Sequence, residues 1–438
     1  MLKLNNKTIY ESLGREPVHP FPARMAPGIA LAAISNATKP LRVLDPMVGS
    51  GTVVALARLK GHKAIGVDID PLAVLISRVW TNAVKAEEAK SKAREVLARA
   101  KKIFAQTKQS EAYPSGSDRE TRRFVCYWFD GYARRQLCSL AIAITRVRNH
   151  ATRDVLLCAL SRLIITKQSG ASLALDLSHS RPHKAFRRAP VKPFRKFLAA
   201  VDHVAENCVN KKGTNRGPAP RVYLGDARNL PVRGGSIDLV VTSPPYLNAI
   251  DYIRCSKFSL VWMGYRIPDL RELRGESVGA EAAKSDLKDD PGIQDIVVGL
   301  NLKPGLKRRD EAVLARYIED MRSAMREVAR VLAPGGKAVY VIGENTVRGT
   351  YIRNSRIICD IARSCGLKLK ERRIRNLPAN RRYLPPPSAR RKSASMDGRM
   401  RREVVLAFGK PKAKTVQAER LRGRVDRGSC LPRAYALG

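Results

Sequence analysis

The chain has 438 residues, more than one ordinary domain, and its 82 lysines and arginines outnumber 39 aspartates and glutamates to give a formal net charge of +43. Such a charge opposes folding through self-repulsion but attracts a polyanion, so it favours a nucleic-acid partner. No run approaches the ~18 apolar residues needed to cross a bilayer, and residues 1–7 lead into no apolar signal core, so we expect a cytoplasmic protein without a membrane partner. The eight cysteines include no Cys-x-x-Cys pair, which indicates neither a disulfide framework nor a metal site.

The first motif lies between two predicted strands. An apolar strand at 41–44 runs into the turn Asp45-Pro46-Met47-Val48-Gly49-Ser50-Gly51-Thr52, and a helix is predicted over 53–60. Glycines let a backbone approach a ligand closely, and a helix N-terminus offers unpaired N–H groups. A second strand, 63–68, ends in Asp68 about 20 residues past the glycines, the spacing at which an acid reaches ribose hydroxyls in Rossmann-type sites. The turn lacks a third glycine, which is unlike a nicotinamide fingerprint.

A long basic insertion follows, over 81–220. Apolar residues at helical spacing predict helices over 86–104 and 134–165. The segment 122–132 mixes aromatic residues with arginines, which suits nucleic-acid contact, although packing of the helices is the favoured explanation. The segment 184–196 is basic and interrupted by prolines, so we predict a loop that contacts a phosphate backbone.

The second motif follows the apolar strand 237–241 and reads Thr242-Ser243-Pro244-Pro245-Tyr246. Two prolines make a stiff, extended loop at the carboxyl edge of a sheet, where open α/β folds bind ligands. A serine hydroxyl and a proline carbonyl would present two acceptors to an amino group, and the tyrosine ring offers a face for a planar base. Taken alone, the four letters are more typical of a polyproline turn closed by a core tyrosine. The combination of these four residues with the glycine turn and Asp68 favours a ligand-binding site instead.

The remaining pattern predicts the end of a doubly wound α/β sheet. An amphipathic helix over 311–332 precedes a strand over 337–342, and a last strand over 403–408 is predicted to pair antiparallel at the sheet edge. The polar stretch 266–308 is predicted as a mobile lid. Past Lys410 the chain is basic and without apolar pattern, which predicts a disordered tail that binds phosphates.

Together these residues resemble the DNA amino-methyltransferases, S-adenosylmethionine-dependent enzymes that methylate the exocyclic N4 of cytosine or N6 of adenine. The resemblance covers roughly half of the chain and is to the Ser-Pro-Pro-Tyr type, most like site-specific cytosine-N4 enzymes. It implies a catalytic tetrad of Ser243, Pro244, Pro245 and Tyr246. It further implies cofactor contacts from the segment before the glycine turn (Phe21, Pro22, Arg24), the turn itself (Asp45, Pro46, Met47, Gly49, Gly51, Thr52), a ribose-binding acid (Asp68) and an adenine contact (Asp226).

The resemblance implies a Rossmann-like methyltransferase sheet with a mostly helical insertion domain. The expected organisation is a cofactor-binding first part (1–80), the helical basic insertion and candidate DNA-contacting region (81–220), a second part with the catalytic loop (221–265), a polar insertion (266–310), the end of the methyltransferase domain (311–409) and a basic tail (410–438).

The implied partners are double-stranded DNA, with the target base flipped out, and a cognate restriction endonuclease. Within this family a serine in the first tetrad position goes most often with cytosine, which favours N4-methylcytosine as the product. Three alternatives remain open: an adenine-N6 enzyme, an RNA guanine-N2 methyltransferase, which usually has Asp in place of Ser243, and a non-catalytic nucleic-acid-binding protein with this fold. Cytosine C5 methylation is set aside because no Pro-Cys dipeptide occurs in the chain.

Overall fold

The computed structural model describes residues 7–35, 37–175, 177, 182–209, 217–247, 251–279, 290–303, 305–347, 350–376 and 402–412. Its strands are β1 (Arg42–Asp45), β2 (Lys63–Asp68), β3 (Arg221–Leu224), β4 (Ile237–Thr242), β5 (Leu332–Gly343), β6 (Asn345–Val347), β7 (Thr350–Ile352), β8 (Lys368–Asn376) and β9 (Arg402–Gly409). Its helices are α1 (Ile9–Leu13), α2 (Pro27–Ile34), α3 (Thr52–Leu59), α4 (Pro71–Thr81), α5 (Ala86–Gln106), α6 (Arg119–Trp128), α7 (Gly131–Thr145), α8 (His150–Ile164), α9 (Pro193–Glu206), α10 (Tyr252–Leu260), the 3₁₀ turn η1 (Val261–Met263), α11 (Ile267–Glu276), α12 (Pro291–Gly299), α13 (Arg308–Val331) and α14 (Asn354–Ser364).

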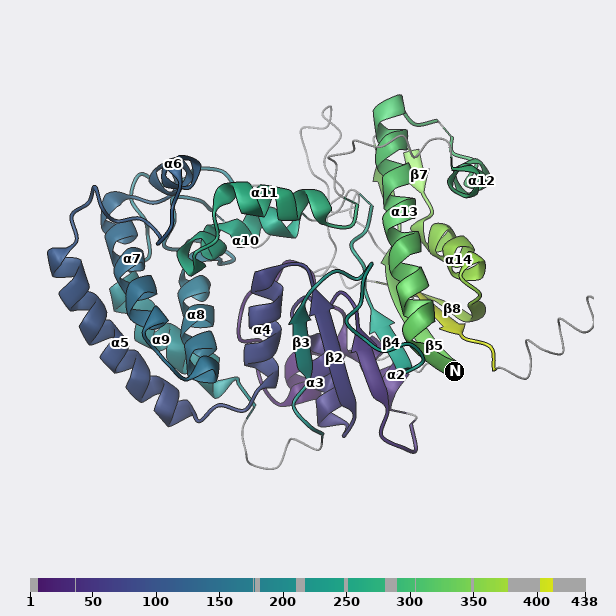
Figure 1. Ribbon diagram of the computed structural model, residues 1–438, viewed down its shortest axis with the longest axis horizontal. Helices are drawn as coiled ribbons and strands as arrows, with labels where there is room; N and C mark the ends of the chain where they lie inside the picture. Colours follow the sequence, from purple (N-terminus) through teal and green to yellow (C-terminus); the bar gives the residue numbers. More distant parts are fainter. Residues whose placement is uncertain are drawn as a thin grey trace, which may run out of the picture.

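Seven of the described strands form one mixed sheet in the order β3-β2-β1-β4-β5-β9-β8 (Figure 1). The first five of these run parallel, whereas β9 is antiparallel to both β5 and β8. The strand order reverses between β1 and β4, because the chain goes outward from β1 to β3 and then returns to start again at β4. The doubly wound Rossmann-like α/β fold predicted from the sequence is confirmed.

The position predicted for the last strand is wrong. β9 is antiparallel, as expected, but it lies inside the sheet between β5 and β8, and β8 is the edge strand. The segment Lys368–Asn376 alternates few apolar residues with many charged ones, and nearly all of its side chains are at least partly exposed. It therefore lacks the apolar pattern from which strands are recognised. Its regular structure depends on pairing with β9, whose central residues Val404, Val405 and Leu406 are buried.

The sheet separates two apolar layers, and successive residues of one strand face opposite layers. Val339 and Val341 of β5 belong to the cluster formed with α2, α3, α4 and the helical insertion. Ala338, Tyr340 and Ile342 of the same strand belong to the cluster formed with α13 and α14. The period of two thus places helices on both faces of the sheet, which explains why its central strands read as continuous apolar runs.

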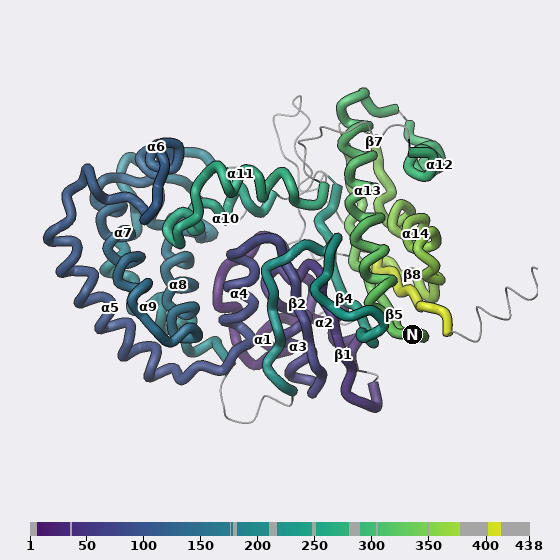
Figure 2. The backbone as a smooth tube through the Cα atoms, viewed as in Figure 1, coloured from purple at the N-terminus to yellow at the C-terminus, as the bar shows by residue number. Residues whose placement is uncertain are grey.

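The insertion after α4 is helical, and its helices α5 to α9 lie together at one end of the sheet (Figure 2). The helix predicted over 134–165 is two helices, α7 and α8, separated by a turn at residues 146–149. The loop predicted over 184–196 ends early, because Pro193 begins α9, a position where proline's missing N–H costs nothing. The polar stretch 266–308 contains α11 and α12, while residues 280–289 lie outside the described part of the chain.

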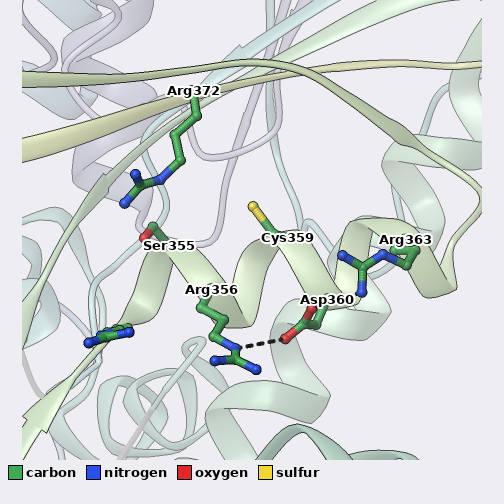
Figure 3. A pocket seen from close by; sticks show the side chains of 7 residues that line it. Ser355, Arg356, Cys359, Asp360, Arg363 and Arg372 are labelled. Atoms are coloured by element: carbon green, nitrogen blue, oxygen red, sulfur yellow. Dashed lines mark hydrogen bonds and ion pairs between the residues drawn. The ribbon is translucent and has the colours of Figure 1, made fainter. Parts of the chain in front are cut away.

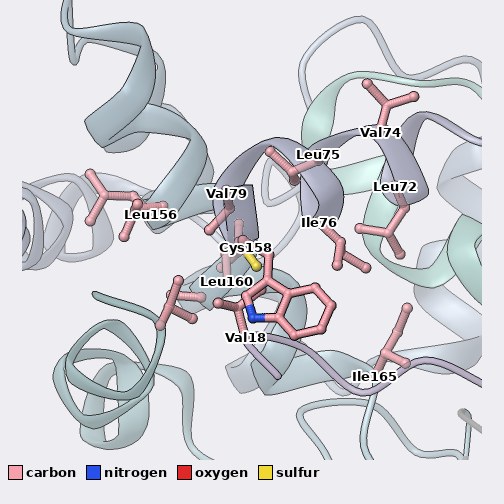
Figure 4. Packing of buried hydrophobic residues seen from close by; sticks show 14 of the residues in the cluster. Val18, Leu72, Val74, Leu75, Ile76, Val79, Leu156, Cys158, Leu160 and Ile165 are labelled. Carbon is pink, nitrogen blue, oxygen red and sulfur yellow. The ribbon is translucent and has the colours of Figure 1, made fainter. Parts of the chain in front are cut away.

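The insertion shares its core with the sheet. Helix α4 packs on α8, where Val79 of α4 lies beside Cys158 and Leu160 of α8 (Figure 4). The segment 122–132 contributes to the same core: Phe129 is buried, and its ring meets the edge of Trp262 at 5.2 Å between centroids. Packing, the favoured explanation for those aromatic residues, therefore accounts for the buried ones. In the described ranges, no helix combines the length and the apolar character needed to cross a bilayer.

Candidate active site

The glycine turn and the Ser-Pro-Pro-Tyr loop are neighbours at the point where the strand order reverses. Val43 and Leu44 of β1 pair with Leu239 and Val240 of β4, although about 190 residues of chain separate these segments. Both strands run in the same direction, so the turn after β1 and the loop after β4 leave the sheet at the same edge. In open α/β sheets this switch point is where ligands bind.

The glycine turn has a conformation that only glycine accepts easily. Gly49 and Gly51 have φ angles of 49° and 85°, and Gly51 is the N-cap of α3. A Cβ on Gly51 would lie 2.9 Å from Ser77 Oγ and 3.1 Å from Ser77 Cα, so the turn lies directly against α4. Ser77 Oγ also donates a hydrogen bond of 2.8 Å to the Gly49 carbonyl. The turn is thus fixed between α3 and α4, with the N-terminus of α3 opening at the sheet edge.

Asp68 ends β2 beside this turn. Its carboxylate accepts hydrogen bonds from the backbone N–H of Gly49 at 2.8 Å and of Asp70 at 2.9 Å. Burial raises the pKa of Asp68, and the two backbone donors oppose that rise. The residue stays partly exposed. Because a carboxylate has about four lone-pair positions, Asp68 can still accept from the hydroxyls of a sugar.

Asp70, the nearby acid, has a structural role. It is 3% exposed, caps α4 by accepting from the Leu72 N–H at 2.9 Å, and accepts from Ser256 Oγ at 2.5 Å. Burial, and then the charge of Asp68, raise its pKa to about 7. Of the two acids, Asp68 is therefore the one placed to meet a ligand.

Asp45 lies under the turn. It is 3% exposed, and burial raises its pKa to about 7, a rise opposed by the Thr242 side chain and the Met47 N–H. Met47 N donates to Asp45 Oδ1 at 3.2 Å. Asp45 thereby fixes the backbone of the turn after β1, and its predicted contact with a cofactor stays a prediction. Direct cofactor contacts from Pro46, Met47 and Thr52 stay predictions.

The segment before α2 covers the glycine turn. A Cβ on Gly49 would lie 3.3 Å from Cε1 of Phe21, so the Phe21 ring rests on the turn. The ring also stacks on Tyr252, the first residue of α10, with centroids 5.6 Å apart and planes at 23°. Pro22 follows Phe21 directly. An aromatic pair from two distant segments therefore covers the turn, and no sequence pattern indicated Tyr252 as its second member.

Arg24, from the same segment, contacts α4 and His19 instead. Its guanidinium lies 5.7 Å from the centroid of the Trp80 ring and donates to the His19 carbonyl. His19 itself is 1% exposed, lies 2.8 Å from the Ser161 hydroxyl of α8, and has a pKa lowered by burial to about 3. These contacts fasten the covering segment to α4 and the insertion. A contact between Arg24 and a cofactor stays a prediction.

Asp226 follows β3 at the same edge. The N–H of Gly225 donates to the Asp68 carbonyl at 2.9 Å, which places the Asp226 turn next to the end of β2. The Asp226 carboxylate is paired with Arg228 at 2.6 Å, and Arg228 also bridges to Asp320 of α13 at 2.6 Å. These pairs raise the pKa of Arg228. Asp226 is thus held firmly, and its predicted adenine contact stays a prediction.

In the tetrad, Ser243 Oγ donates to the Val341 carbonyl of β5 at 3.3 Å and lies 3.5 Å from Tyr246 Oη. The loop is held at its far end as well, because Asn345 Nδ2 donates to the Leu247 carbonyl. Asn354 in turn donates to Asn345 Oδ1 at 3.0 Å. Sequence reasoning missed both asparagines. The available signal was that Asn345 follows strand β5 at the edge where the other motifs lie.

The fold and the site define a Rossmann-like α/β protein in which a glycine turn, an acid ending β2 and a serine–proline loop meet at the switch point. Within the described ranges, no three His, Cys, Asp or Glu side chains gather as metal ligands would. No protein-family model matches the chain.

Comparison with curated proteins finds a relative along nearly the whole chain. The type II methyltransferase M.MvaI of Kocuria varians is 21% identical over 422 residues, covering 89% of each protein. Among solved structures, one is a Thermus thermophilus protein named as a DNA modification methylase and complexed with S-adenosyl-L-methionine. It is 19% identical to this chain, with a TM-score of 0.22, and the match covers 43% of this chain and 52% of the Thermus protein. A SAM-dependent methyltransferase of Methanosarcina mazei is 8% identical, with a TM-score of 0.32 over 86% of this chain and 96% of its own. Structural similarities this weak do not assign a role to any individual residue of this chain.

Proposed function

We propose that the chain is an S-adenosylmethionine-dependent DNA methyltransferase that modifies the exocyclic amino group of a flipped base, with cytosine N4 as the target. The observation that carries the proposal is the Ser243 hydroxyl. Its one hydrogen is donated to the Val341 carbonyl, so the oxygen keeps a lone pair to accept from an amino group even if Tyr246 Oη donates to the other. This acceptor lies at the switch point, beside the turn suited to a cofactor. The curated relative, itself named a type II methyltransferase, supports the same class.

The residues around the turn fit a nucleoside cofactor. Gly49 and Gly51 give the turn its left-handed backbone conformation, and Phe21 with Tyr252 forms an apolar cover above it. Asp68 would accept from the ribose hydroxyls, as acids at this position do in Rossmann-type sites. Asp226 would approach the adenine ring from the end of β3. When bound, S-adenosylmethionine would supply the electrophilic methyl group on its sulfonium.

The tetrad residues would prepare the base. An aromatic amine is a poor nucleophile because its lone pair is delocalised into the ring. Ser243 Oγ and the Pro244 carbonyl would accept its two N–H groups and favour a pyramidal nitrogen with its lone pair directed at the methyl group. Holding the reacting atoms in line contributes up to ~7–11 kcal/mol, and no strong base is needed before transfer. Pro245 stiffens the loop, and stacking on Tyr246 would offset part of the few kcal/mol that flipping costs.

The choice of cytosine rests on Ser243. A neutral serine offers one hydroxyl oxygen, whereas an aspartate offers two charged oxygens. In the resembling family serine goes most often with cytosine N4 and acidic or amide residues with adenine N6. Adenine N6 is therefore the second candidate for the target atom. The same resemblance suggests double-stranded DNA as the substrate and a restriction endonuclease that recognises the same site as a partner.

Mass spectrometry of digested DNA from cells that express the protein tests the proposal. We expect N4-methylcytosine with the wild type, and loss of most of it with Ser243→Ala and Tyr246→Ala, while both variants still bind S-adenosylmethionine. Ser236→Ala is the matched control, because Ser236 lies just before β4, at the opposite end of the strand, and donates only to the local Arg233 carbonyl. N6-methyladenine would overturn the assigned base. Methyl transfer to RNA alone would overturn the substrate.

A further inference from the structure

A basic hollow lies at the other end of the sheet from the helical insertion. It has a volume of about 410 Å³ and opens between α14 and β8 (Figure 3). Its lining includes Arg353, Ser355, Arg356, Asp360, Arg363 and Arg372. None of these residues belongs to the candidate active site.

The lining carries a net positive charge. Asp360 forms ion pairs with Arg356 at 3.8 Å and with Arg363 at 3.2 Å, so one carboxylate faces four guanidinium groups. A second acid, Glu344, lies next to the hollow and accepts from the Ser355 hydroxyl. Even with both acids counted, the arginines are in excess, and arginine is the side chain best suited to bind phosphate oxygens.

The arginines form a stripe that is long for a single phosphate. Arg353 is the N-cap of α14, and Arg356 and Arg363 lie seven residues apart, a spacing that places these two on one face of the helix. At 1.5 Å rise per residue the stripe extends for about 15 Å. Along one strand of duplex DNA phosphates recur every ~3.4 Å of helix axis, so a stripe of this length can meet several of them. Its dimensions favour a phosphate backbone over a small anion.

An exposed aromatic residue extends this basic surface. Tyr351 of β7 is 52% exposed and lies within the electrostatic reach of Arg353, Arg372 and Arg402. Aromatic side chains among arginines are typical of surfaces that bind nucleic acids.

The hollow is joined to the catalytic loop by a short chain of hydrogen bonds. Leu247, directly after the tetrad, accepts from Asn345, and Asn345 accepts from Asn354 at 3.0 Å. Asn354 is the neighbour of Arg353 and the first residue of α14. The start of the arginine stripe is therefore near the sheet edge at which a base would enter.

We propose that this arginine hollow binds the phosphate backbone of duplex DNA outside the recognition site. The insertion and the hollow lie at opposite ends of the sheet (Figure 1), so a duplex engaged by the tetrad would be held on both sides of the flipped base. The inference rests on the proposed function in one respect, namely that duplex DNA is the substrate.

The test compares Arg353→Gln/Arg372→Gln with Arg221→Gln. Glutamine keeps a polar side chain of similar length and removes the charge. Arg221 is an exposed arginine at the start of β3, at the opposite edge of the sheet. Binding of a fluorescent random-sequence duplex is measured by polarisation over a range of salt concentrations. The slope of log affinity against log salt should be shallower by about 1.8 in the double variant, at about 0.9 for each phosphate that is no longer neutralised. The control should keep the wild-type slope.

Equal slopes for the double variant and the control would overturn the inference. Calorimetric titration with inorganic phosphate separates the two sources of phosphate: a double variant that no longer binds phosphate yet keeps the wild-type slope on DNA would mean a free-anion site, which also overturns it. Methylation is assayed in parallel. A wild type that shows the arginine-dependent slope but methylates no DNA refutes the proposed function and leaves this inference standing. A wild type that methylates DNA, with equal slopes in the variants, refutes this inference alone.

Discussion

Asp68 and Asp70 lie two residues apart at the end of β2, in different surroundings. Asp68 is partly exposed and accepts from two backbone N–H groups, whereas Asp70 is buried and fully used by α4 and Ser256. Both acids are close enough to the glycine turn to reach a ribose, and their different burial separates their roles. The distinction has consequences for binding and for stability that can be measured independently.

For binding, we expect Asp68→Ala to weaken S-adenosylmethionine affinity at least tenfold. A hydrogen bond to a charged group contributes about 1.5–3 kcal/mol, and a factor of ten corresponds to about 1.4 kcal/mol. Isothermal calorimetry on the folded variant measures the change. Asp70→Asn is the matched control, and its affinity should stay close to that of the wild type. Unchanged affinity in folded Asp68→Ala would remove this residue from the cofactor site.

For stability, we expect Asp70→Asn to make the protein more stable at pH 8 but not at pH 5. The pKa of Asp70 is raised from 3.8 to about 7 in the folded state, so between these values the folded protein binds more protons than the unfolded chain. The free energy of unfolding therefore falls as the pH rises from about 4 to about 7. Asparagine keeps the helix cap and removes this titration. Urea denaturation of the wild type and of Asp70→Asn at both pH values measures the free energy of unfolding. If this free energy changes with pH by the same amount in both proteins, the prediction is contradicted.

At the scale of elements, the end of β5 and the start of β6 position the Ser-Pro-Pro-Tyr loop. Val341 accepts from Ser243, and Asn345, two residues past the strand, donates to Leu247. The loop is thus held at both of its ends by one short stretch of chain, which runs from the end of β5 to the start of β6. Its geometry depends on residues about 100 positions away in the sequence.

We accordingly expect Asn345→Asp to lower kcat by tenfold or more without changing cofactor affinity. Aspartate has nearly the same shape but cannot donate to the Leu247 carbonyl, and small misplacements of reacting groups cost up to ~10²-fold. Single-turnover methylation together with calorimetry measures the two quantities. Asn376→Asp, at the exposed end of β8, is the control. An unchanged kcat in Asn345→Asp, or a loss of cofactor affinity large enough to account for the lower rate, would show that Asn345 does not position the loop.

The sequence predicts well those helices and strands whose own residues show the apolar pattern of their secondary structure. The strand Ile237–Thr242 is largely apolar, and the helix Arg308–Val331 has apolar residues at helical spacing. β8 could not be predicted, because its charged residues are ordered by β9, which pairs with it along its length. The second aromatic ring over the glycine turn, Tyr252, and the asparagines behind the tetrad were likewise invisible, since each depends on which segments become neighbours in space.

At the scale of the whole molecule, a single apolar cluster extends from the sheet through α4 into the helices of the insertion. Trp80, fully buried at the end of α4, marks the junction, with Arg15 and Arg24 each 5.7 Å from its ring centroid. The insertion is therefore part of the folded body, which fixes any DNA-contacting surface on it relative to the tetrad.

Residues 413–438 lie outside the described part of the chain, so the tail predicted from the sequence is tested by deletion. These residues include six lysines and arginines against two acids. We expect their removal to make the salt dependence of DNA binding shallower by about 0.9 per phosphate that the tail neutralises, and to leave S-adenosylmethionine affinity unchanged. Stopping after Lys412 keeps Lys410, whose Nζ donates to the Leu332 carbonyl at 2.7 Å. An unchanged slope and affinity would leave the tail without a role in DNA binding.

The placement of β9 inside the sheet has a consequence for biosynthesis. β5 and β8 each pair with β9, and β9 comprises residues 402–409. While the ribosome is still translating the interval after β5, one side of that strand has no partner, and β8 has nothing to join. At about 5–20 residues per second this interval lasts roughly 3–13 s. During it the nascent chain presents an apolar strand edge of the kind that chaperones bind and that drives aggregation.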